Sequence, residues 1–189
     1  MSIDITFTLR DEDLDRFREM VTNARQSVDD EDTARKVKQA AADLVEKARK
    51  QDLPRFIEER LGKLEILLNM ITDSEWQLDD DECKAILSAL AYFAEPDDLI
   101  PDSIPGIGFL DDALYTEIIL QELEDEVRTY TEFCQFRIAE ENRRRNQGRD
   151  PYVGREDWLA DKRSVLHSRM RARRSGGPRT SGRWRVGLF

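Results

Sequence analysis

The sequence predicts an all-α fold, a bundle-like domain of about five helices with a short N-terminal strand, one long projecting helix and a basic C-terminal tail. Three observations lead to this fold class. Apolar residues recur every three or four positions over most of the chain, which is typical of amphipathic helices. Charged residues make up 37% of the 189 positions, enough to cover the outer faces of such helices. Three of the six prolines and two of the nine glycines fall in residues 95–112, where they separate helices.

The first elements are one strand and four helices. Residues 3–9 alternate between apolar and polar side chains, which predicts a short strand, and residues 14–24 follow with helical spacing. A second helix is predicted over 32–50. A third opens at Pro54, because a proline in the first turn of a helix is tolerated. A fourth begins near Asp80.

The longest helical pattern starts at Phe109 and continues to about Arg145. A helix of about 37 residues would be about 55 Å long, so we expect its distal half to project from the domain. Aromatic side chains on that half, at 130, 133 and 136, need a covering partner, either a basic helix predicted over 155–174 or another subunit. A homo-oligomer therefore stays open.

The net charge of −10 conceals an uneven distribution. Residues 1–142 contain 16 Lys/Arg and 36 Asp/Glu, whereas residues 143–189 contain 14 and 4. We therefore expect a helical body over 1–146 and a basic appendage over 147–189, partly helical and partly flexible. The N-terminus lacks a secretory signal pattern, and the longest nearly apolar run is too short to span a bilayer. A cytoplasmic protein without a membrane span is expected.

The basic tail carries the predicted partner-binding residues. Arginines mixed with aromatics suit phosphate contacts and base stacking, and basic segments also bind acidic protein surfaces, including the chain's own body. Charge alone does not choose between a protein partner, a nucleic acid and docking on the body. The candidate residues are Arg169, Arg171, Arg173, Arg174, Arg179, Arg183, Trp184, Arg185 and Phe189.

The proline-rich connector carries a dense motif. It reads Tyr92-Phe93-Ala94-Glu95-Pro96, then Asp98-Leu99-Ile100-Pro101-Asp102, Ile104-Pro105, Gly108 and Asp111-Asp112. Over about 83–122 this pattern resembles the YkvA-like family, a bacterial domain of unknown function. The resemblance implies a small helical domain built around the connector and supplies no catalytic residue. The motif positions expected to be structural are Pro96, Pro101, Pro105 and Gly108.

Four aspartates of the connector, Asp98, Asp102, Asp111 and Asp112, have two interpretations. Carboxylates are the ligands that Mg²⁺ and Ca²⁺ take. Acids in the first turn of a helix are also stabilised by the helix dipole, and aspartates cap turns by accepting backbone N–H bonds. We favour the structural interpretation, because acids at helix starts need no ion, and no cofactor is expected.

Most other catalytic constellations are missing from the sequence. His167, the single histidine, lies in the tail, which excludes a His-dependent triad or a His-bearing zinc site in the body. We therefore expect a non-enzymatic interaction or adaptor protein that contacts a partner protein through its long helix and arginine-rich tail. Two alternatives stay open: an RNA- or single-strand-associated protein acting through the tail, and a carboxylate-dependent metal-binding enzyme.

Overall fold

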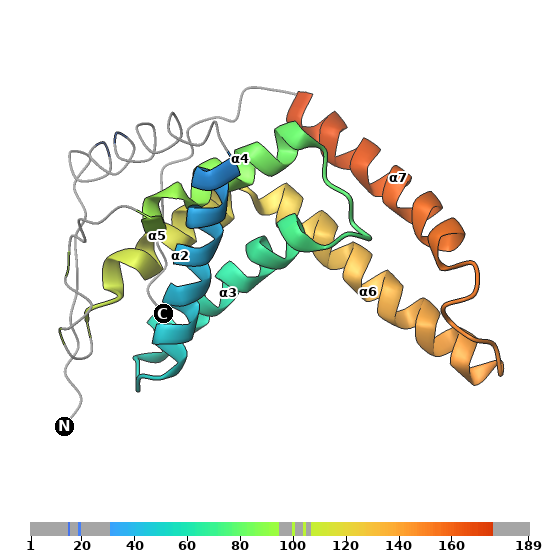
Figure 1. Ribbon diagram of the computed structural model, residues 1–189, viewed down its shortest axis with the longest axis horizontal. Helices are drawn as coiled ribbons and strands as arrows, with labels where there is room; N and C mark the ends of the chain where they lie inside the picture. Colours follow the sequence, from blue (N-terminus) through green and yellow to red (C-terminus); the bar gives the residue numbers. More distant parts are fainter. Residues whose placement is uncertain are drawn as a thin grey trace. The chain divides into compact units, whose positions relative to one another are not determined.

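The computed structural model describes residues 31–94 and 107–175, together with the single positions Asp15, Glu19, Ile100 and Ile104 (Figure 1). Over these residues the chain forms six α-helices and one 3₁₀ helix, without a strand. The predicted all-α fold class is confirmed for this part of the chain. The predicted N-terminal strand and the end of the basic tail lie outside it.

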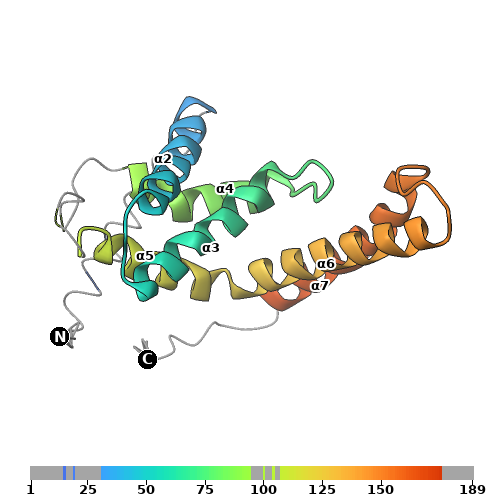
Figure 2. The same cartoon turned by 90° about the horizontal axis from the view of Figure 1, so that it is seen from below.

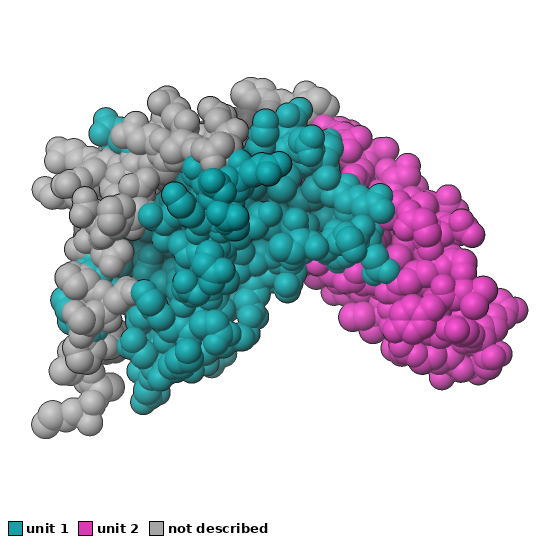
Figure 3. All heavy atoms as spheres, viewed as in Figure 1, with its two compact units in different colours: residues 1–123 teal, residues 124–189 magenta. Residues whose placement is uncertain are grey.

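The chain divides into two compact units, residues 1–123 and residues 124–189 (Figure 3). The sequence also predicts a boundary after residue 146, between the helical body and the basic appendage. That boundary stays a prediction. The first unit contains α2 (Glu31–Arg49), α3 (Arg55–Thr72), α4 (Asp80–Leu90), the 3₁₀ helix η1 (Ala91–Ala94) and α5 (Leu110–Glu122). The second contains α6 (Glu124–Asn146) and α7 (Arg155–Ser175).

Helices α2 and α3 pack against each other in the first unit, and each begins within one residue of its predicted start. Acids open α2 and bases close it, which suits the helix dipole, and its apolar residues face α3. Pro54 precedes α3 with φ −55°, close to the value that the pyrrolidine ring fixes. Both helices bury one stripe: Val37, Ala41, Leu44, Val45 and Ala48 on α2, and Ile57, Leu61, Leu64, Leu67 and Met70 on α3.

Residues 73–79 join α3 to α4. The Asp73 carboxylate accepts the N–H groups of Glu75 at 2.9 Å and Trp76 at 3.3 Å, and the Trp76 side chain is fully buried. Asp79 then caps α4 by accepting the Glu82 N–H at 2.8 Å. These two aspartates fix where one helix ends and the next begins.

The single long helix predicted from Phe109 to Arg145 is wrong, because the chain forms two helices there. The interruption is at Leu123, with φ −102° and ψ 22°, whose N–H still bonds the Ile119 carbonyl at 2.8 Å. Three acids, Glu124, Asp125 and Glu126, form the first turn of α6. Negative charge stabilises a helix N-terminus, so this acidic run favours a new start at that point.

Helices α6 and α7 form an antiparallel hairpin in the second unit (Figure 2). Helix α6 ends at a glycine in the left-handed region, Gly148 with φ 68°. The N–H groups of Gly148 and Arg149 bond the carbonyls of Arg145 and Arg144 at 3.0 and 2.9 Å, which is a Schellman motif. The predicted basic helix over 155–174 is confirmed as α7. No helix in the described part of the chain is long and apolar enough to cross a membrane.

Candidate functional site

The end of the connector leads directly into α5. Gly108 is buried, and its N–H donates to the Ile104 carbonyl at 2.9 Å. The Leu110 N–H bonds the Ile107 carbonyl at 3.0 Å as the helix begins. Of the four predicted structural positions, Gly108 is in the described part of the chain, and Pro96, Pro101 and Pro105 lie outside it.

Asp111 and Asp112 lie in the first turn of α5 and are buried, with exposed fractions of 4% and 6%. Asp111 Oδ2 accepts the backbone N–H of Ile100 at 3.1 Å, eleven residues earlier. This bond ties the connector to the start of α5, where the helix dipole also favours a carboxylate. Asp111 therefore has an architectural role whether or not an ion binds nearby.

The predicted metal site remains a prediction. Asp98 and Asp102 lie outside the described residues, so the structure brings together two of the four aspartates. Within the residues that are described, no group of three His, Cys, Asp or Glu side chains is arranged to hold a metal ion. A site at this end of α5 would require ligands from the undescribed part of the connector.

An aromatic cluster packs η1 against α5. The ring centroids of Tyr92 and Tyr115 are 4.1 Å apart, and Phe93 meets Tyr115 at 5.4 Å in an edge-to-face arrangement. The Tyr115 hydroxyl donates to the Ala89 carbonyl at 2.9 Å in the interior. Tyr92 and Phe93 belong to the motif identified in the sequence, whereas Tyr115 was missed. Its position four residues after Asp111, on the same helix face, was the available signal.

A half-buried ion pair joins α3 to α5. Arg60 Nε lies 3.3 Å from Glu117 Oε2, and their side chains are 17% and 22% exposed. The Arg60 guanidinium also covers the Phe56 ring at 4.2 Å. Sequence reasoning missed this pair, although Glu117 stands out as a charge in an otherwise apolar stretch of α5.

Two of the predicted partner-binding arginines pair with acids of α6. Arg169 Nη1 lies 2.8 Å from Glu132 Oε2, and Arg173 Nη1 lies 3.3 Å from Asp125 Oδ1. Arg171 is exposed on α7, and Arg174 belongs to the same helix. The remaining candidates lie outside the described residues: Arg179, Arg183, Trp184, Arg185 and Phe189.

Glu132 is shared by two cations of α7. Lys162 Nζ lies 2.7 Å from its Oε1 and Arg169 Nη1 2.8 Å from its Oε2. The hydrogen bond from Lys162, helped by the charge of both bases, lowers the pKa of the Glu132 carboxyl below its ordinary value. All three side chains remain partly exposed, so solvent and salt screen these pairs.

The hairpin also has a small apolar interface. Phe133 of α6 and Leu159, Leu166 and Met170 of α7 are fully buried. The Phe136 and Trp158 rings approach to 6.0 Å between their centroids. Helix α7 therefore covers aromatics of α6, which confirms the first of the two covering partners expected from the sequence. His167 is buried on α7, with 7% of its surface exposed.

Arginines pair with two glutamates of α6 near the loop that joins α6 to α7. Glu140 accepts bonds from Arg143 at 2.6 and 2.7 Å and from Arg144 at 2.8 Å. The hydrogen bonds from Arg143, then those from Arg144, lower the pKa of Glu140 to about 2. Glu141 holds Arg145 at 3.1 Å and Arg155 at 2.8 Å.

Comparison with known proteins identifies one segment of the chain. Residues 84–115 match the model of a family described as a protein of unknown function (DUF1232). This segment runs from α4 through η1 and the connector to the aromatic cluster on α5. Searches of curated proteins and of solved structures found no match. The chain is thus similar to that family over the region where Asp111 and Tyr115 fix the start of α5.

Proposed function

We propose that this chain is a non-enzymatic cytoplasmic interaction protein, and that its α6–α7 hairpin and arginine-rich C-terminal segment contact an acidic partner protein. The observation that supports this proposal is the division of charge between the two units. Residues 1–123 contain 14 Lys/Arg and 30 Asp/Glu, whereas residues 124–189 contain 16 and 10. The cationic surplus is therefore carried by a compact unit of its own, which favours anionic partners.

The ion pairs of α7 are compatible with such a contact. Arg169 and Arg173 keep 43% and 40% of their side-chain surface exposed while paired. A guanidinium has five N–H donors, so one carboxylate leaves donors for a second anion. Exposed pairs of this kind contribute only about 0–1 kcal/mol, and a partner carboxylate can displace them at low cost.

We further infer that the segment similar to the DUF1232 family carries the YkvA-like signature. The matched residues 84–115 fall within the 83–122 region of that resemblance. In this proposal the segment is scaffolding, because Asp111 bonds the Ile100 backbone and Tyr115 bonds the Ala89 carbonyl. Its role is to set the geometry of the helices around the connector.

Affinity capture tests the proposal. The full-length chain is compared with a variant that carries Arg169→Gln, Arg171→Gln and Arg173→Gln and lacks residues 176–189. A matched control carries Arg35→Gln, Lys36→Gln and Lys50→Gln on the first unit. We expect the same acidic protein to co-purify with the full-length chain and the control, and not with the α7 variant. Equal recovery by all three proteins would contradict the proposal.

The same capture distinguishes the nucleic-acid alternative. Treatment with nuclease before elution leaves a direct protein contact intact. If nuclease removes the captured material, the arginine-rich segment contacts RNA or single-stranded DNA and the protein partner is indirect. Charge supports this alternative equally, because phosphates and carboxylates both attract arginine.

Thermal unfolding tests the metal-dependent alternative. We expect millimolar Mg²⁺ or Ca²⁺ to leave the melting temperature unchanged, because Asp111 already accepts a backbone N–H. A site that binds an ion only in the folded state would raise the melting temperature with metal concentration. If the melting temperature rises with metal and Asp112→Asn abolishes that rise, this segment holds a metal site and the proposed scaffolding role is wrong.

A further inference from the structure

The tip of the hairpin, residues 143–155, combines exposed apolar side chains with arginines on a fixed backbone. Tyr152 and Val153 are 66% and 68% exposed. The Schellman motif at Gly148 fixes the start of the loop, and the Asp150 carboxylate accepts the Tyr152 N–H at 2.9 Å. An exposed aromatic on such a loop is available to a ligand without prior ordering of the chain.

The Tyr152 ring contacts a cation that is itself held by two other residues. The Arg155 guanidinium lies 5.3 Å from the ring centroid, within cation–π range. Arg155 is itself bound to Glu141 at 2.8 Å and lies 5.3 Å from the Trp158 ring. The ring is therefore positioned by a cation that has its own anchors.

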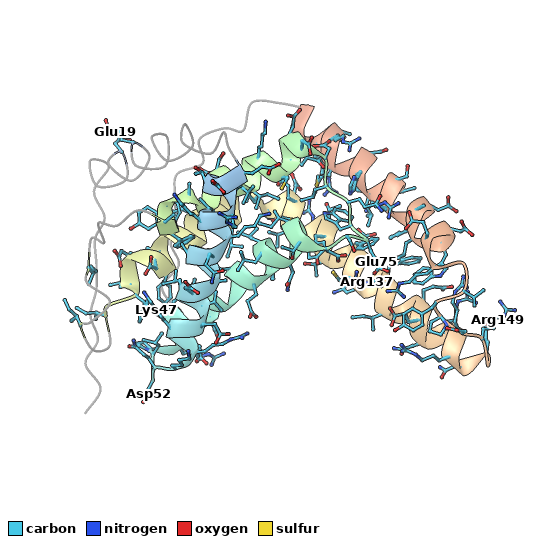
Figure 4. The ribbon with its side chains drawn as sticks, viewed as in Figure 1. Glu19, Lys47, Asp52, Glu75, Arg137 and Arg149 are labelled. Atoms are coloured by element: carbon cyan, nitrogen blue, oxygen red, sulfur yellow. The ribbon has the colours of Figure 1, made fainter. Side chains whose placement is uncertain are left out.

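Arginines are frequent in the loop that carries this ring. The tip contains five arginines and one acid, Asp150. Four of the arginines pair with Glu140 or Glu141 just before the tip. Arg149 forms no ion pair with the acids that the structure describes, and its side chain extends away from the loop in Figure 4. The tip thus offers a guanidinium that no described acid pairs with, three residues before an exposed aromatic ring.

The size of this surface narrows the chemistry of the ligand. Two exposed apolar side chains fall far short of the roughly 800 Å² that each partner buries in a stable protein interface. An aromatic ring beside cations suits an unpaired base that stacks on the ring while its phosphates meet arginine. Bases within a duplex are already stacked and do not offer a free face.

We propose that the hairpin tip binds single-stranded nucleic acid, with a base stacked on Tyr152 and a phosphate bound by Arg149. This surface lies at the opposite end of α7 from Arg173, about 30 Å away along a helix of 21 residues. It therefore goes beyond the contact with an acidic protein and does not depend on it.

Fluorescence anisotropy of a labelled oligouridine of about 12 nucleotides, with the full-length chain at about 50 mM salt, tests this proposal. We expect Tyr152→Ala to weaken binding about tenfold and Tyr152→Phe to change it by less than about twofold, because the phenylalanine ring still stacks. Arg149→Gln should reduce the slope of log affinity against log salt by about 0.7. Arg35→Gln, at an exposed site on α2, is the matched control and should change neither quantity.

A second background separates the tip from the tail. In a chain carrying Arg179→Gln, Arg183→Gln and Arg185→Gln, the tenfold loss caused by Tyr152→Ala should persist. If Tyr152→Ala has no effect in either background, the proposal is wrong. Equal affinity for a duplex of the same length would also overturn it, as would Tyr152-dependent binding to anionic phospholipid vesicles without binding to oligouridine.

Discussion

Different interactions stabilise the interior of each of the two units. In the first unit, α3 lies between α2 and α5 and buries a continuous apolar stripe, and Leu64, Leu67 and Trp76 are almost completely inaccessible. In the second, two helices share a short apolar interface, and charged contacts such as Lys162–Glu132 extend along its edges. Apolar burial does not depend on charge screening, whereas exposed ion pairs are screened by salt. A unit can present cations to a partner only where its own packing leaves them near the surface.

Truncation of the first unit's core should give the largest effect. Leu64 is fully buried on α3, so Leu64→Ala removes apolar contacts and leaves a cavity. We expect a loss of about 2–5 kcal/mol in the free energy of unfolding, measured by urea denaturation. Ile138→Ala, at a position of α6 that is 59% exposed, is the control and should change stability by less than about 0.5 kcal/mol. Similar losses in both variants would mean that the buried stripe of α3 does not stabilise the first unit more than an exposed position of α6 stabilises the second.

Loss of the Tyr115 hydroxyl should give an intermediate effect. Tyr115→Phe keeps the ring between Tyr92 and Phe93 but removes the donor to the Ala89 carbonyl. We expect a loss of about 1 kcal/mol, because the carbonyl keeps its buried position without this bond.

Tyr152→Phe also removes a tyrosine hydroxyl, but from a residue that is 66% exposed, where water replaces any lost hydrogen bond. Urea denaturation of both variants measures the difference. An unchanged stability in Tyr115→Phe would show that the buried cluster depends on packing alone.

Neutralising Glu132 should give a smaller effect that depends on salt. Glu132→Gln removes the acid shared by Lys162 and Arg169 while keeping the shape of the side chain. We expect a loss below about 1 kcal/mol at low salt, because all three side chains are partly exposed. The loss should nearly disappear at about 1 M salt, where the Debye length falls to about 3 Å. A loss that is independent of salt would indicate that Glu132 acts through packing.

The helices could be predicted from sequence because their signals are local. Proline before α3, Asp79 before α4 and Gly148 after α6 each act on the adjacent turn, so they are visible in the sequence. The break at Leu123 was missed because the apolar rhythm continues on both sides of it. The acids at the start of α6 favour the start of a new helix, whereas the apolar rhythm favours one continuous helix. Tertiary packing decides which of these two signals prevails.

The candidate sites were predictable in composition but not in pairing. The two aspartates at the start of α5 follow from the helix dipole, whereas the bond from Asp111 to the Ile100 backbone depends on the path of the connector. The sequence shows an excess of arginine after residue 142, but not that Arg169 and Arg173 meet acids of α6. Contacts between residues tens of positions apart follow from helix packing, which residue spacing alone does not determine.

Acid titration tests the charged contacts at the hairpin tip. Arg143 and Arg144 lower the pKa of Glu140 from 4.5 to about 2 in the folded chain. A carboxyl whose pKa is lowered by folding contributes stability above its unfolded pKa and loses that contribution as the pH falls toward its folded pKa. The contribution of Glu140 should therefore be complete above about pH 4.5 and lost progressively toward pH 2.

NMR titration of the Glu140 side-chain carboxyl measures this shift directly. In Arg143→Gln the pKa should rise toward its ordinary value, because the two bonds from that guanidinium are gone. Arg128→Gln, on the same helix but paired with Asp125, is the control and should leave the pKa of Glu140 unchanged. A pKa near 4.5 in the unaltered chain would mean that water replaces these bonds in solution. The arginines of the tip would then be free for an anionic ligand at even lower cost.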